Sequence, residues 1–301
     1  MIDLQPLELI ASVAEDQWGL VTRRQADRLG VTRKAFENLS APGRLLVRIA
    51  SGVYRLVGTP VTEHFALKAA WLQLDPGIFA YERTFEQGVV SHRSAAAVFQ
   101  IGHLPEQSHE FTVSRRRQTR RPDVRLHLRR YEAHECTRNQ GLLLTRPARI
   151  AADLLAERED PGAVGHLIAD VLRRDLDQPD FVARSIAPHA LNFGLRRSDG
   201  LGLLRWLLEL VGDPAIDIWL QTARVALQVD EVRDSPSKES NAQRVIPQAL
   251  DMQPRERSAV RSPLAWVRSP RTDGGRCTIS NVSSLTTAFS SVSTSLTKDG
   301  L

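Results

Sequence analysis

Apolar and polar positions in the first forty residues predict three helices. Residues 6–16 repeat apolar side chains three or four positions apart, which is the spacing of one helix face. Residues 22–30 and 32–40 each begin at a threonine, which favours helix N-termini. Gly19, Gly30 and Gly43 lie at or shortly after the ends of the three segments. Two short helices joined by Gly30 and Val31 are typical of a helix-turn-helix.

The segment after the third helix changes to a period of two, which predicts a β-hairpin. Residues 45–49 and 53–57 are extended, alternating runs, and Gly52 lies in the loop between them. Three helices followed by a hairpin indicate a winged helix-turn-helix domain over residues 1–58.

The third helix of such a domain enters the major groove of DNA with its N-terminal residues at the base edges. Arginine can bind guanine through two hydrogen bonds, and asparagine can bind adenine in the same way. The candidate DNA contacts on these helices and on the wing are Arg23, Arg24, Thr32, Arg33, Lys34, Asn38, Arg48 and Arg55. Phe36 and Leu39 are expected in the core, and a protein-docking role for the module is the alternative.

Residues 59–230 mix helical and extended patterns and predict an α+β domain with a small sheet and several helices. A helical pattern over 62–76 is followed by a short strand and a helix over 88–102. Residues 142–144 resemble a buried strand, and further helices follow it. His92 lies in the first turn of a predicted helix with no base or nucleophile near it in sequence, so we assign it no catalytic role.

The most basic stretch, residues 114–130, lies between and along two predicted strands. Alternation predicts that Val124, Leu126 and Leu128 point into the core of a hairpin. The arginines would then lie in its loop and on its solvent-exposed face. The candidate residues for a secondary phosphate contact or an antitoxin surface are Arg115, Arg116, Arg117, Arg120, Arg121, Arg125 and Arg129.

Composition adds a weak positive charge and excludes several classes of protein. The net charge is +5, and clustered positive charge is typical of proteins that bind phosphate. The cysteines, Cys136 and Cys277, lack metal-site spacing, so we expect no metal, disulfide framework or cofactor. No long apolar run or signal-peptide pattern appears, which predicts a cytoplasmic protein without membrane contact.

An enzymatic role is not expected, because the acidic residues do not form a recognisable site. Asp217, Asp230 and Glu231 are scattered, whereas a metal-dependent nuclease needs converging carboxylates and usually a lysine. Residues 231–301 are polar and rich in serine and threonine, and we expect this tail to be disordered.

Five ordered segments resemble the AbiEi antitoxins of type IV toxin–antitoxin systems. They are "VTRRQADRLGVTRKAFENL", "RIASGVYRLVG", "VVSHRSAAAVFQIG", "HEFTVSRRRQTRRPDVRLHLRR" and "GLLLTRPARIAADLL". The resemblance covers roughly residues 5–215 and leaves the tail outside.

The resemblance implies a winged helix fused to an α/β antitoxin domain. It implies repression of the protein's own operon through operator DNA, carried here by Thr32, Arg33, Lys34, Asn38, Arg48 and Arg55. It also implies that the second domain counteracts a nucleotidyltransferase-type toxin without needing a stable complex. The alternatives are a winged-helix regulator without a toxin partner and a nuclease-related protein that processes nucleic acid.

Overall fold

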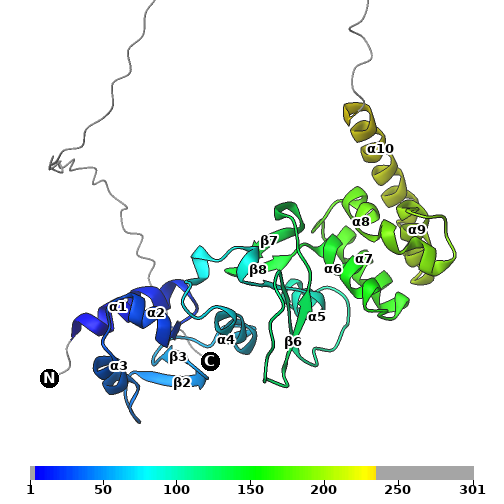
Figure 1. The fold of residues 1–301 in the computed structure, drawn as a ribbon. Helices are drawn as coiled ribbons and strands as arrows, with labels where there is room; N and C mark the ends of the chain where they lie inside the picture. The colour runs from blue at the N-terminus through cyan, green and yellow to red at the C-terminus, as the bar shows by residue number, and fades with distance from the viewer. Residues whose placement is uncertain (1–3, 235–301) are drawn as a thin grey trace, which may run out of the picture. The chain divides into compact units, whose positions relative to one another are not determined.

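The computed structural model describes residues 4–234 (Figure 1). The N-terminal part has three helices and a three-stranded sheet of order β1-β3-β2. Its elements are α1 (Leu4–Asp16), β1 (Leu20–Thr22), α2 (Arg23–Arg28), α3 (Arg33–Ser40), β2 (Leu46–Ala50) and β3 (Val53–Leu56). The predicted winged helix-turn-helix is therefore present.

Local capping explains where the two short helices begin. The Thr22 hydroxyl accepts a hydrogen bond from the N–H of Gln25, and the side-chain carbonyl oxygen of Gln25 accepts one from the N–H of Thr22. Thr32 caps α3 by accepting from the N–H of Ala35 at 3.2 Å. The buried side chains of this part, which pack between the helices and the sheet, are Ile10, Val21, Ala26, Val31, Phe36, Leu39 and Leu46.

The rest of the described chain surrounds a five-stranded sheet of order β6-β5-β4-β8-β7. Its strands are β4 (Val89–Val90), β5 (His109–Val113), β6 (Val124–Leu128), β7 (Cys136–Asn139) and β8 (Leu142–Thr145). Its α-helices are α4 (Phe65–Leu74), α5 (His92–Phe99), α6 (Pro147–Ala156), α7 (Pro161–Arg173), α8 (Pro179–Ile186), α9 (Gly200–Leu210) and α10 (Ile216–Asp234). The α+β class is thus confirmed, whereas the domain boundaries after residues 58 and 230 stay predictions.

The predicted hairpin over the basic stretch is wrong, because β5 and β6 run parallel. His109 pairs with Val124, and Val113 pairs with Leu128. The chain between the two strands must therefore cross from the end of β5 back to the level at which β5 begins. The position of Leu128 is also corrected, since its side chain is 63% exposed at the edge of the sheet. Val124 and Leu126 are only partly buried against the core. The alternating pattern identified the two faces of β6. It did not show that the core covers the apolar face only in part.

A tight turn that the sequence reading did not include joins β7 to β8. Gln140 and Gly141 both have positive φ, at 49° and 78°, as a two-residue hairpin turn requires. A side chain at Gly141 would also lie 2.9 Å from the indole of Trp18, which itself donates a hydrogen bond to the carbonyl of Gln140.

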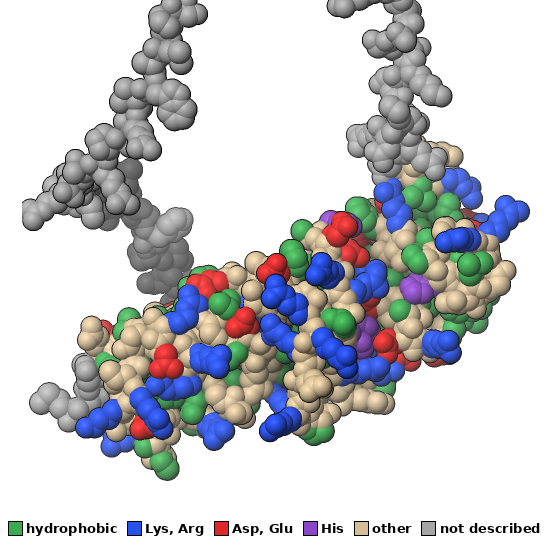
Figure 2. Space-filling view, in the orientation of Figure 1, with side chains coloured by type: hydrophobic (Ala, Val, Ile, Leu, Met, Phe, Trp, Pro, Cys, Tyr) green, Lys and Arg blue, Asp and Glu red, His purple; other side chains and the backbone are tan. Residues whose placement is uncertain are grey.

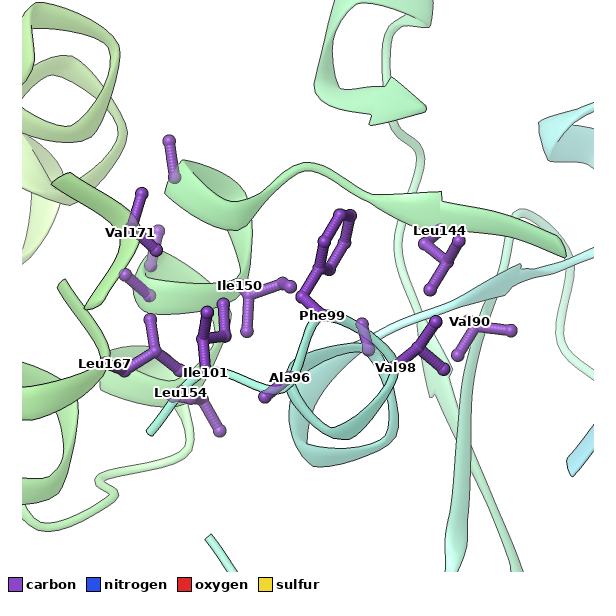
Figure 3. Close-up of a cluster of buried hydrophobic side chains, with 14 of the residues drawn as sticks. Val90, Ala96, Val98, Phe99, Ile101, Leu144, Ile150, Leu154, Leu167 and Val171 are labelled. Carbon is purple, nitrogen blue, oxygen red and sulfur yellow. The ribbon is translucent and has the colours of Figure 1, made fainter. Parts of the chain in front are cut away.

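The main core lies between the sheet and helices α5, α6 and α7 (Figure 3). Val90 and Leu144 come from the strands, Phe99 from the end of α5, Ile101 from the chain just after it, and Ile150 from α6. Leu154 and Leu155 of α6 are also buried, and helix α10 adds an element that the sequence reading did not include. Within residues 4–234, no helix is both long and apolar enough to cross a membrane.

Candidate functional site

The exposed face of α3 brings together most of the predicted base-reading residues. Arg33, Lys34 and Asn38 are exposed, while Phe36 and Leu39 on the other side are buried in the core. The guanidinium of Arg33 pairs with Glu37 one turn along, at 2.7 Å, on the open surface. An exposed pair of this kind contributes little to stability, so Arg33 is available to a ligand.

The four other basic candidates of this part differ in exposure. Arg24 is exposed, whereas Arg23 is half-buried, pairs with Asp27 and lies 4.8 Å above the ring of Phe36. Arg23 therefore has a packing contact with the core.

The two wing arginines lie on opposite faces of the three-stranded sheet. Arg48 pairs in register with Tyr54, and the ring of Tyr54 packs edge-on against Phe36 of α3. Arg55 is the next residue along β3, so it points to the other face, where it donates to the carbonyl of Thr59. A duplex held against α3 would thus meet Arg48 more directly than Arg55.

Basic side chains continue over the second part of the molecule, mixed with acidic ones (Figure 2). Among the loop arginines, Arg115, Arg116 and Arg120 are exposed and have no carboxylate partner in the described chain. Arg117 and Arg121 are tied to α4, through the carbonyl of Leu74 and the side chain of Gln73 respectively.

The arginines on β6 and just after it, Arg125 and Arg129, face acids of neighbouring elements. Arg125 pairs with Glu157 just after α6, and Arg129 reaches Asp153 of α6 at 3.5 Å. The face of β6 that was predicted to be solvent-exposed therefore lies partly over α6, and its arginines neutralise acidic residues in and just after that helix.

A buried polar layer, which the sequence reading missed, lies between the sheet and α6. Hydrogen bonds run from His92 through Ser91 and Thr112 to the hydroxyl of Tyr131, with steps of 2.9, 2.8 and 3.0 Å. We use the term buried polar layer for these four residues together with Asp153 and Arg149.

The layer ends on a buried ion pair. Tyr131 donates to Asp153 at 2.7 Å, and Arg149 donates to the same carboxylate from two nitrogens, at 2.9 and 2.5 Å. Burial and the charge of Asp153 raise the pKa of Tyr131 well above its usual range. Tyr131 is therefore a hydrogen-bond donor at neutral pH and not a proton source. The sequence signal for this pair was an Arg and an Asp four residues apart on an otherwise apolar helix face.

At the other end of the layer, the rings of His92 and His127 stack at 3.7 Å and 13°. Burial, and secondarily the neighbouring His127, lower the pKa of His92 to about 4, so its ring is neutral at pH 7. Glu110 lies beside them; burial raises its pKa, but His127 and the N–H of Arg93 more than offset this and lower it overall.

One group in the described chain has the residue types of a metal site. His92, His127 and Glu157 offer ligand atoms that lie within 4.8 Å of one another. Two imidazoles and a carboxylate suit zinc, but the lone pairs of stacked rings run parallel and do not converge on one ion. Glu157 is also paired with Arg125. The arrangement is explained better as two stacked histidine rings beside a charge-balanced layer, with the buried ring of His92 neutral.

The scattered acids discussed as nuclease candidates do not form one site. Asp217 and Asp230 both lie on α10, thirteen residues apart along the helix. At 1.5 Å per residue this separation is about 20 Å, so the two backbone positions cannot hold the same metal ion.

Comparison with known proteins identifies the N-terminal part. Residues 8–57 match the family model described as transcriptional regulator, AbiEi antitoxin. The match spans the three helices and the wing and confirms the resemblance there. It supports an antitoxin and regulator role, with which DNA binding is consistent. No curated protein matches the chain.

Proposed function

We propose, from an N-terminal segment that matches the AbiEi antitoxin regulators, that this protein represses its own promoter and counteracts a nucleotidyltransferase-type toxin. The observation that carries the proposal is the exposed face of α3. Arg33, Lys34 and Asn38 are exposed on a helix whose other side is buried in the core, so their side chains can reach base edges.

In this proposal the two parts of the molecule have separate tasks. Residues 1–58 read the operator sequence, and residues 59–230 add affinity for phosphate and carry the antitoxin role. Exposed Arg24 and Arg48 and the capping residue Thr32 lie near α3 in the chain or on its side of the wing. Arg23 and Arg55 are half-buried and would act mainly by stabilising the fold of residues 1–58.

Replacing Arg33 and Lys34 together by alanine should weaken binding to the protein's own promoter by about tenfold to a hundredfold. The physical reason is the loss of hydrogen bonds to base edges, so binding to an unrelated duplex should change much less. Mobility-shift titrations on promoter and scrambled duplexes measure both affinities.

The matched control removes the same charge from another exposed site. Arg196 and Arg197 lie in the loop before α9 and are exposed. Their double alanine variant should keep the preference for the promoter. An Arg33 and Lys34 variant that keeps its full promoter preference would mean that α3 does not read the sequence.

Replacing Arg115, Arg116 and Arg120 by alanine should weaken binding to every duplex alike. Each lost phosphate contact should reduce the slope of log affinity against log salt by roughly one. Titrations at several salt concentrations give the slope, and an unchanged slope would show that the loop does not touch DNA.

The antitoxin role is tested separately, by rescue of growth when the full chain is co-expressed with a nucleotidyltransferase-like protein encoded beside it.

A further inference from the structure

A basic pocket of about 250 Å³ lies at the end of β5, beside the chain that follows β6. Arg115 contributes from the start of the loop, and Arg129 and Arg130 contribute from the other side. Tyr131 and the ring of Phe85 line the same pocket. The three arginines come from two chain segments that meet only because β5 and β6 run parallel.

The charge in this pocket is not balanced within the described chain. Arg115 and Arg130 have no carboxylate partner there, and Arg129 reaches only Asp153, which Arg149 already neutralises. Glu86 is the one acid among the lining residues. Arginine donors that face a concave surface without a partner suit a phosphate group.

The pocket is also preorganised. The guanidinium of Arg129 is held between the carboxylate of Asp153 and the ring of Tyr131, 5.8 Å from the ring centre. Tyr131 is fixed in turn by its hydrogen bonds in the buried polar layer. A donor that is already oriented loses less freedom when a ligand binds.

One wall of the pocket is apolar and partly open. The ring of Phe85 is 38% exposed. An exposed aromatic ring next to arginines can stack on a nucleobase while the arginines bind its phosphate.

We propose that this pocket binds a free nucleotide, with its phosphate against Arg115, Arg129 and Arg130 and its base against Phe85. The site is separate from α3 and does not depend on base reading there, although it shares Arg115 with the loop arginines proposed to contact DNA phosphate. It would give the second part of the molecule a small ligand of its own.

The test uses the full chain and calorimetric titration with a nucleoside 5′-monophosphate, the matching nucleoside and inorganic phosphate. The nucleotide should bind tightest of the three. Arg115→Ala should weaken nucleotide binding about tenfold or more, because a charge-assisted hydrogen bond to phosphate is lost. Phe85→Leu should weaken binding of the nucleotide but not of inorganic phosphate.

The control is Arg120→Ala, which removes the same charge from the same loop. Arg120 is exposed and does not line the pocket, so its loss should change nucleotide affinity less than twofold. Equal losses in the two variants would show diffuse loop charge and overturn the proposal. So would the absence of nucleotide binding at millimolar concentration, or inorganic phosphate that binds as tightly as the nucleotide.

Discussion

Replacing Asp153 by alanine is expected to lower the free energy of unfolding by about 3–5 kcal/mol. The carboxylate is almost fully buried and accepts hydrogen bonds from Tyr131 and from two nitrogens of Arg149. Without it, the charge of Arg149 stays buried with only Glu135 at 3.3 Å. Urea unfolding followed by far-UV circular dichroism measures the change.

Two further variants test whether the loss of stability comes from the buried ion pair or from the removal of any acidic side chain. Glu209→Ala removes an exposed partner of Arg205 in α9 and should cost no more than about 1 kcal/mol. A double variant with Arg149→Met and Asp153→Leu should be more stable than Asp153→Ala, because no buried charge is left unpaired. A loss below about 1 kcal/mol for Asp153→Ala would contradict the role given to the layer.

The N-terminal part could be predicted because its signals are local. The capping box of Thr22 and Gln25, the cap at Thr32 and the glycine-containing wing each lie within a few residues. Local signals of this kind depend little on the rest of the chain, so the order of helices and the wing follow from the sequence alone.

The second part could be predicted only coarsely because its pairings are distant. Parallel pairing of β5 with β6 depends on the whole sheet, and a period of two does not show whether both faces of a strand are covered. Leu128 was placed in the core for this reason, although its side chain is 63% exposed at the sheet edge. The buried polar layer could not be predicted either, because His92 and Asp153 are far apart in sequence.

Stability is expected to fall by about 3 kcal/mol as the pH drops from 6.5 to 4, through His92 alone. Burial in the folded state lowers the pKa of His92 to about 4 from its ordinary value of 6.5. The unfolded chain therefore takes up a proton first, and the stabilisation present above pH 6.5 is lost as pH falls through the folded pKa. Urea unfolding midpoints at several pH values measure this loss.

The contribution of His92 is isolated by comparing variants, because other groups titrate in the same range. Burial also lowers the pKa values of His109 and His189, and His92 itself faces His127, Glu110, Asp153 and Glu157. His92→Asn suits the positive φ of 54° at this position and carries no titrating ring, so its stability should decline less between pH 6.5 and 4. His166→Asn, at an exposed position, should follow the unmodified protein. If His92→Asn shows the same decline as the unmodified protein, the acid sensitivity arises elsewhere and the buried ring of His92 is not its source.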